Sequence, residues 1–218
     1  MPTNRESTAA GYDATAEAYA ARYAGELDHK PLDRALLRAF AHEAGATSDP
    51  STLMVADVGC GPGHIARFLS RQGLPVCCVD LSPAMCAIAR RLNPGAHVHQ
   101  ASMDAIPVPD AAWSGIVAFY ALCHVAGSEL PVVLREFARV LRPEGMVLVA
   151  FHAGDEVRHA DELLGVPVDL DFHFHTTSKV AELLDDAGFE VTAVMERVAY
   201  QPWEVATRRA YIQARKRE

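Results

Sequence analysis

The sequence predicts an α/β fold built on a largely parallel sheet. An apolar run, Leu53–Val58, stops at a cluster of glycines, and residues with helical spacing follow immediately. A second apolar run, Leu74–Val79, ends at Asp80 and is followed by Ser82-Pro83, a typical helix start. Strands and helices that alternate in this order favour parallel strands joined by crossover helices.

The composition restricts the class of protein. The chain has 218 residues, of which 50% are hydrophobic, so it is long enough for one domain with a sizeable core. A formal net charge of −8 disfavours binding to a nucleic-acid backbone. No apolar run reaches membrane-spanning length, and the polar start Met1–Thr8 is no signal peptide. Five cysteines without a C-x-x-C pair are expected to be reduced, so we expect a cytoplasmic protein with no nucleic-acid or membrane partner.

Two helices are predicted before the first strand. Apolar residues at helical spacing begin at Tyr12 and include three tyrosines, which either pack in the core or cover a site. A second helix follows Pro31 and ends near Gly45. The polar residues 1–10 are expected to fray, and residues 47–52 are expected to form the loop into the first strand.

Five further strands follow the first two. They are expected at His97–Ala101, Trp113–Tyr120, Met146–Phe151, Phe189–Val198 and Thr207–Ala214. Amphipathic helices are expected over Val133–Leu141 and from Thr177 to Gly188. The segment Ala153–His175 is the least regular part and is too long for an ordinary connection.

Three glycines at every second position form the predicted turn after the first strand. Gly59, Gly61 and Gly63 leave backbone N–H groups free at a helix start, which favours an anionic ligand group. A dinucleotide fingerprint, G-x-G-x-x-G, would need a glycine where His64 stands. With Asp57 in front of it, the pattern resembles motif I of the class I S-adenosylmethionine (SAM) methyltransferases, although glycine turns also close ordinary connections.

Other segments carry the same resemblance, which covers Tyr12–Lys216. The pattern Tyr-Asp-x-x-Ala-x-x-Tyr from Tyr12 is similar to the lid helix of the small-molecule branch of this family. Phe119–His124 resembles the motif after strand four. Arg139–Gly145, followed by an apolar strand, resembles a third family segment, with Glu144 in place of the usual glycine.

The resemblance implies a fold and a division of the chain into segments. The implied fold is a seven-stranded, mostly parallel Rossmann-like sheet with an antiparallel last strand and helices on both faces. A single methyltransferase domain is implied over residues 1–218. Within it, residues 1–46 form an N-terminal helical lid and residues 153–175 a substrate-loop insertion.

The resemblance also implies SAM as the cofactor and S-adenosylhomocysteine as its product. At the carboxyl end of the second strand, Asp80 is placed to accept hydrogen bonds from both ribose hydroxyls. Asp104 is implied as an acceptor for the adenine amine, and Tyr12 as a contact to the methionine end. The predicted cofactor-binding residues are Tyr12, Tyr19, Asp57, Gly59, Gly61, Gly63, Asp80, Leu81, Met85, Ser102, Met103, Asp104, Phe119 and Tyr120.

In-line methyl transfer mainly needs a positioned nucleophile, and some nucleophiles must also lose a proton. The predicted catalytic bases are His124, His152 and His173, with Tyr19 as an orienting residue. A metal site at His173 and His175 is the alternative, but strand alternation favours two histidines on one face of a strand, and no metal is expected. The long segment 153–175 is assigned to the substrate pocket.

The predicted function is an enzyme, a SAM-dependent methyltransferase that moves a methyl group to a small-molecule acceptor by in-line SN2 transfer. The N/D-P-P-Y/F motif of amino-group and adenine methyltransferases is missing after the fourth strand, which disfavours DNA and protein glutamine as acceptors. Two alternatives stay open. One is a SAM-binding protein without transfer activity, in a regulatory or partner role, and the other is a nicotinamide-dependent oxidoreductase.

Overall fold

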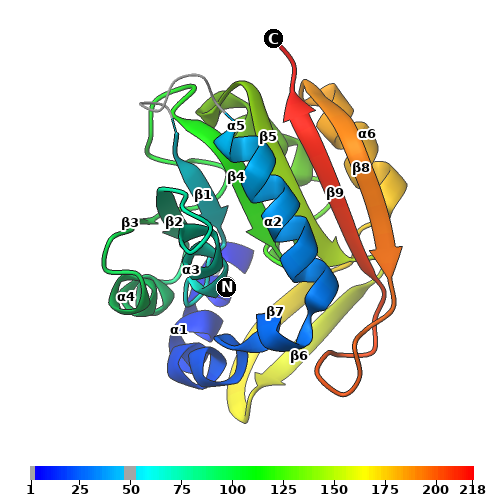
Figure 1. The fold of residues 1–218 in the computed structure, drawn as a ribbon. Coiled ribbons are helices and arrows are strands. Elements are labelled where there is room, and N and C mark those ends of the chain that lie inside the picture. Colours follow the sequence, from blue (N-terminus) through cyan, green and yellow to red (C-terminus); the bar gives the residue numbers. More distant parts are fainter. Residues whose placement is uncertain (1–2, 47–52) are drawn as a thin grey trace.

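The structure is a computed structural model that describes residues 3–46 and 53–218, so the predicted loop at 47–52 lies outside the described residues. Seven strands form one sheet in the order β3-β2-β1-β4-β5-β9-β8 (Figure 1). Their bounds are β1 Val55–Val58, β2 Val76–Asp80, β3 His97–Gln100, β4 Trp113–Phe119, β5 Leu141–His152, β8 Phe189–Arg197 and β9 Arg209–Lys216. The first five strands pair in parallel, whereas β9 is antiparallel to both β5 and β8. The predicted sheet with its antiparallel last strand is confirmed.

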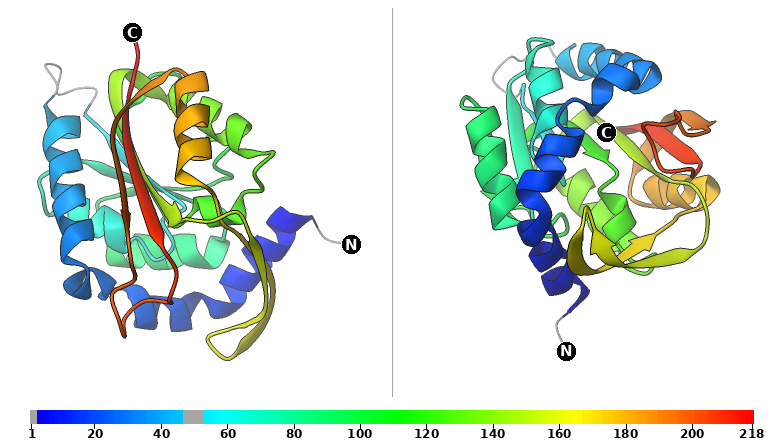
Figure 2. Two further views of the ribbon diagram at one scale, coloured as in Figure 1. Left: turned by 90° about the vertical axis from the view of Figure 1, so that its right-hand side faces the viewer. Right: turned by 90° about the horizontal axis from the view of Figure 1, so that it is seen from below.

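Helices cover both faces of this sheet. On one face, α2 (Pro31–Gly45) packs over strand residues such as Val117. On the other face, α5 (Leu130–Val140) and α6 (Thr177–Asp186) pack over the neighbouring residue Ile116, because successive strand residues point to opposite faces. Figure 2 shows α2 and α6 on opposite sides of the sheet. The remaining helices of the parallel part are α3 His64–Ser70 and α4 Pro83–Leu92.

Two elements lie across the edge where the parallel strands end. Helix α1 (Asn4–Tyr23) and the hairpin of β6 (Val157–Leu163) and β7 (Val166–His173) lie below the ends of β1 and β4 (Figure 1). Seen from below, α1 and the hairpin are neighbours (Figure 2). A glycine permits their close approach, because a Cβ on Gly11 would lie 3.0 Å from a methyl carbon of Leu170.

Helix α1 begins earlier than the sequence suggested. The prediction that residues 1–10 fray is wrong for its described part, because α1 already starts at Asn4. Thr3 and Glu6 form a capping box, in which the backbone N–H of Thr3 donates to the Glu6 carboxylate at 2.7 Å. This cap holds Arg5 in the first turn of the helix.

Residues 153–175 form a β-hairpin rather than an irregular loop. Strands β6 and β7 pair antiparallel up to Leu163 and Val166, so the connection has two residues, Leu164 and Gly165. Both have positive φ, 53° and 79°, as a type I′ turn requires. The usual sequence signal for this turn is Asn-Gly or Asp-Gly, and a leucine in the first position hides it.

Three further properties of the described chain bear on its class. The five cysteines are buried thiols. Within residues 3–46 and 53–218, no helix is both long and apolar enough to cross a bilayer. In the same residues, no group of three or more histidine, cysteine, aspartate or glutamate side chains is arranged to hold a metal ion.

Candidate active site

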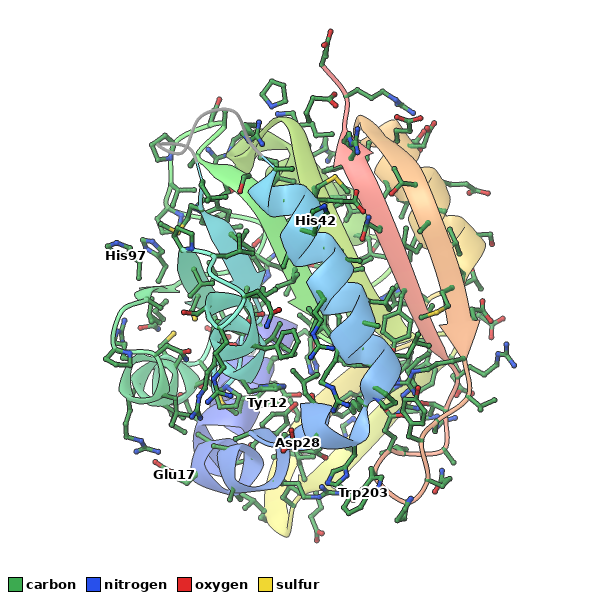
Figure 3. All side chains as sticks on the ribbon, in the orientation of Figure 1. Tyr12, Glu17, Asp28, His42, His97 and Trp203 are labelled. Atoms are coloured by element: carbon green, nitrogen blue, oxygen red, sulfur yellow. The ribbon has the colours of Figure 1, made fainter. Side chains whose placement is uncertain are left out.

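A cavity of about 710 Å³ follows the carboxyl edge of the sheet. Its lining comes from the ends of β1, β2, β4 and β5, from the segment after β3 and from the start of β9, and α1 and the β6–β7 hairpin cover it. Figure 3 shows Tyr12 of α1 beneath the sheet, whereas Glu17 of the same helix points outward. Cavities of this size are typical of sites that bind small molecules.

The glycine turn lies against the first part of this cavity. Its three glycines all have positive φ. Gly61 lines the cavity, and a Cβ there would meet Tyr19 at 3.9 Å, an ordinary contact distance, so the backbone stays open to a ligand. Gly63 is not among the lining residues; it precedes α3, and a Cβ there would lie 2.5 Å from Asn93 Nδ2. Packing therefore requires a glycine at position 63, and the cofactor contact of Gly63 stays a prediction.

Two carboxylates hold the turn in shape. Asp57 accepts a hydrogen bond from the backbone N–H of Ala66 at 2.9 Å, and burial raises the pKa of Asp57 to about 7. The two oxygens of Asp80 accept from the backbone N–H groups of Gly61 at 2.7 Å and Ser82 at 2.9 Å. Burial raises the pKa of Asp80, and these backbone donors oppose the rise. Each Asp80 oxygen keeps a further lone pair for a ligand hydroxyl.

The segment after β3 forms one end of the cavity. Ser102 donates to Asp104 Oδ1 at 2.5 Å, and Arg5 donates to Asp104 Oδ2 at 2.5 Å. Burial alone would raise the pKa of Asp104, but the bonds from Ser102 and Arg5 outweigh it and lower the pKa. Arg5 thus joins α1 to the predicted adenine site.

The middle of helix α1 forms hydrogen bonds to the rim of the cavity. Asp13 Oδ1 accepts from the Ser82 hydroxyl at 2.5 Å and from the backbone N–H of Ala84 at 3.0 Å, at the start of α4. Two tyrosines of the same helix, Tyr12 and Tyr19, line the cavity, and their rings meet edge to face with centroids 5.6 Å apart. Of the two predicted roles for the tyrosine stripe, the structure favours covering a site.

Two of the three predicted bases line the cavity. His124 Nε2 lies 2.7 Å from the Tyr12 hydroxyl, at the end of the short helix η3 (Leu122–His124). His152 ends β5, and its Nδ1 lies 2.8 Å from the Thr207 hydroxyl. Burial lowers the pKa of both histidines to about 4, so both rings are neutral at pH 7.

The third predicted base is placed elsewhere. The hairpin contributes phenylalanines to the cavity: the ring centre of Phe172 is 4.9 Å from that of His124, and Phe174 stacks on His152 at 5.1 Å. His173 stands between these two phenylalanines and is not among the lining residues, since alternate residues of a strand point to opposite faces. The predicted role of His173 as a base therefore has no support from its position.

The other end of the cavity, over β5 and β9, is lined by buried charged residues. Lys30, Glu204 and Arg209 are 5%, 8% and 4% exposed. Lys30 Nζ lies 3.3 Å from Glu204 Oε1 and 5.2 Å from the ring centre of Tyr120. Tyr120 has a φ of 56°, a left-handed conformation that is rare for an aromatic residue, and its hydroxyl is 2.9 Å from that of Tyr211. Strain of this kind is found at functional positions.

The cavity brings together most of the residues predicted from the sequence. Those that line it are Tyr12, Tyr19, Asp57, Gly59, Gly61, Asp80, Leu81, Met85, Ser102, Met103, Asp104, Phe119, Tyr120, His124 and His152. The charged lining residues that sequence reasoning missed are Arg5, Arg22, Glu26, Lys30, His64, Glu129, Arg158, His159, Glu204 and Arg209. His64 directly follows the glycine turn, whereas the others lie outside the motifs found in the sequence, so no sequence signal marked them.

Comparison with known proteins agrees with this geometry. A family model described as a methyltransferase domain matches residues 56–149, from β1 to β5. A malonyl-[acyl-carrier protein] O-methyltransferase of Enterobacter lignolyticus is 29% identical over 160 residues, which cover 72% of this chain and 57% of that protein. A protein of the same name from Serratia marcescens is 36% identical over 92 residues, which cover 42% of this chain and 35% of that protein. The matched part thus spans between 35% and 57% of the length of these two relatives.

Solved structures share the fold. The magnesium protoporphyrin IX methyltransferase of Synechocystis PCC 6803, solved with bound SAM, has a TM-score of 0.71 at 12% identity, covering 99% of this chain and 98% of that one. The [4+2]-cyclase SpnF has a TM-score of 0.65 at 21% identity, covering 84% and 80%. At these sequence identities, the comparison shows a shared fold only. Over residues 56–149 the chain is similar to the methyltransferase domain, and its fold is shared with solved SAM-dependent methyltransferases.

Proposed function

We propose that this chain is an enzyme that transfers a methyl group from SAM to a small-molecule acceptor. The observation that carries the proposal is the extent of the cavity, which follows the sheet from the end of β3 to the start of β9. At a spacing of about 4.8 Å between strands, this edge extends over about 24 Å. The predicted cofactor residues occupy the part from β3 to β4, so the part over β5 and β9 is left for a second molecule.

The residues along the first part suit the cofactor. Gly61 leaves open space on the side of Tyr19, so a ligand can approach the backbone of the turn. Asp80 offers lone pairs to ribose hydroxyls, and Asp104 offers an acceptor to an adenine amine. When bound, SAM supplies a methyl group on a sulfonium, which is a good leaving group.

Tyr12 and His124 are placed to move a proton. In the proposed arrangement, the Tyr12 oxygen accepts a proton from a hydroxyl or amine of the acceptor as its bond to the methyl group forms, and in the same step Tyr12 passes its own proton to Nε2 of the neutral His124, 2.7 Å away. The two transfers occur together, because burial raises the pKa of Tyr12 well above its usual value and lowers that of His124 to about 4, which disfavours a free tyrosinate. Holding the acceptor in line contributes up to about 7–11 kcal/mol of the barrier reduction.

The names of similar proteins support transfer activity and also one alternative. Two curated relatives are named O-methyltransferases, and one structural neighbour is named a methyltransferase of magnesium protoporphyrin IX. A further neighbour with the same fold is named a [4+2]-cyclase. This fold thus also occurs in a protein that is not named a methyltransferase, so a SAM-binding protein that transfers no methyl group is kept as the second candidate.

Turnover distinguishes the two candidates. The purified chain would be incubated with SAM labelled in the methyl group and with separate pools of phenols, amines, carboxylic acids and thiols. We expect S-adenosylhomocysteine to accumulate together with a labelled product in one pool, and His124→Gln to slow this step while SAM still binds. Tight SAM binding without S-adenosylhomocysteine in any pool would favour the second candidate.

A further inference from the structure

Arg209 is a buried arginine at the acceptor end of the cavity. It is the first residue of β9, is 4% exposed and lines the cavity. Its Nη1 donates to the carbonyl oxygens of Val205 at 2.6 Å and Thr207 at 2.7 Å, and also to the Thr207 hydroxyl. These three bonds fix the position of the guanidinium group.

The opposite edge of this guanidinium group has no hydrogen-bond partner in the described chain. Its Nε is buried without a partner, and its Nη2 donates to no described residue. Glu204 Oε2 lies 3.6 Å from Nε, and it already accepts from Arg197 at 2.6 Å and from the backbone N–H of Tyr200 at 2.7 Å. A buried donor left without a partner costs about 1–3 kcal/mol, so this edge favours an acceptor supplied by a ligand.

Other cations surround the same end of the cavity. Lys30 and Arg158 line it together with Arg209. Burial lowers the pKa of His152, and Arg209, Lys30 and Arg158 each lower it further, whereas Glu204 raises it by less. Three of the four charged groups that act most on His152 are therefore cations, which favours an anionic group beside this ring.

The hydrogen bonds around His152 indicate where its proton lies. The Thr207 hydroxyl accepts from Arg209, so its own proton is available to His152 Nδ1, 2.8 Å away. A neutral ring that accepts at Nδ1 carries its proton on Nε2. With this tautomer, His152 offers a second donor to a ligand.

We infer that this end of the cavity binds a carboxylate of the methyl acceptor, held by the Nε–Nη2 edge of Arg209 and by Nε2–H of His152. The inference rests on the proposed function, since the second molecule in the cavity is taken to be the acceptor. A carboxylate matches the two parallel N–H groups of a guanidinium edge. The rings of Tyr120, Phe174 and Trp203 line the surrounding walls, so the acceptor is an aromatic carboxylic acid or one of similar flat shape.

Phenylacetate and phenylacetamide are matched probes, because they share a shape and differ in charge. In calorimetry with S-adenosylhomocysteine present, phenylacetate is expected to bind at least tenfold more tightly than phenylacetamide. Arg209→Gln should remove this preference. Arg208→Gln should keep it, because Arg208 is 61% exposed in its side chain and pairs with Glu196 at the surface.

If Arg209→Gln does not fold, an NMR pH titration of the histidines in the wild-type protein tests the inference instead. Bound phenylacetate should raise the pKa of His152, since it adds negative charge beside the ring, and phenylacetamide should leave that pKa unchanged. No binding of phenylacetate, equal affinity for both probes, or an unchanged His152 pKa with phenylacetate bound would each overturn the inference. Failure of S-adenosylhomocysteine itself to bind would instead overturn the proposed function.

Discussion

Asp80 combines two tasks in a single side chain. It accepts from Gly61 and Ser82 and so holds the glycine turn, and it is the predicted partner of the ribose hydroxyls. Asp80→Ala is expected to weaken binding of S-adenosylhomocysteine more than tenfold, because both sets of contacts are lost. Calorimetry measures this, with Asp110→Ala as the control, because the Asp110 side chain is 80% exposed and pairs with Arg139. Unchanged affinity in Asp80→Ala would remove this residue from the site.

Glu144 stands where the family resemblance places a glycine, and its φ of 62° explains the preference. A side chain in this left-handed conformation costs about 1–2 kcal/mol. Glu144→Gly is therefore expected to raise the free energy of unfolding by about 1 kcal/mol, allowing for the greater entropy of glycine in the unfolded chain. Glu144→Ala keeps a Cβ and should bring no such gain. Urea denaturation compares the three proteins, and equal stability of all three would show that no strain is stored here.

The two buried histidines make stability depend on pH. The pKa of His124 is about 4 in the folded chain and about 6.5 when unfolded, so between these values the unfolded chain binds a proton that the folded chain does not. This histidine therefore lowers stability as the pH falls from 6.5 toward 4. His124→Gln should lose less stability than wild type over this range, measured by urea denaturation at pH 7.0, 5.5 and 4.5. Asp57, whose pKa is raised to about 7 in the folded chain, stabilises both proteins as the pH falls, so its effect cancels in the comparison. If the stability of the two proteins changed equally with pH, the lowered pKa assigned to His124 would be contradicted.

Single residues differ in how well the sequence predicts them. The lining glycines and Asp80 were predicted because a motif fixes their spacing relative to a strand end. Arg5 was not, because its partner Asp104 is 99 residues away in the chain and only the packing of α1 brings the two together. Arg209 was not predicted for the same reason, since His152 and Tyr120, which lie beside it, are 57 and 89 residues away in the chain.

At the scale of elements, helix α1 is attached by contacts of unequal strength. Asp13 joins it to two part-buried donors at the start of α4, the Ser82 hydroxyl and the N–H of Ala84. Glu17 pairs with Arg91 where both side chains are more than half exposed. Asp13→Ala is expected to weaken S-adenosylhomocysteine binding several-fold and to speed tryptic cleavage within α1. Glu17→Ala should do neither, because an exposed pair contributes about 0–1 kcal/mol. Equal effects of the two substitutions would show that α1 is not held by Asp13.

Elements with strong periodicity were predicted well, and elements defined by a turn were not. The helix α5 and the strand β4 are long and apolar on the expected positions, so the sequence predicts both. The hairpin was missed because Leu164 occupies a turn position at which asparagine or aspartate is the usual signal. The start of α1 was missed because residues 1–10 are mostly polar and only the Thr3–Glu6 capping box marks a helix there.

At the scale of the whole molecule, the two halves of the cavity were unequally predictable. The cofactor half follows consecutive parallel strands, so local motifs place its residues at one edge. The half over β5 and β9, which is proposed to hold the acceptor, depends on β9 pairing beside β5, which brings Arg209 opposite His152 across 57 residues of chain. That register follows from the packing of the complete sheet, so no short segment of the sequence predicts it.

The central claim is that the carboxyl edge of this sheet binds SAM and its product. Thermal unfolding in the presence of S-adenosylhomocysteine or NAD tests it most directly. A ligand at about 100 times its dissociation constant adds about 2.7 kcal/mol to the free energy of unfolding. We expect S-adenosylhomocysteine to raise the unfolding temperature of the wild type, NAD to leave it unchanged, and Asp80→Ala to lose the response. Stabilisation by NAD with none by S-adenosylhomocysteine would contradict the account.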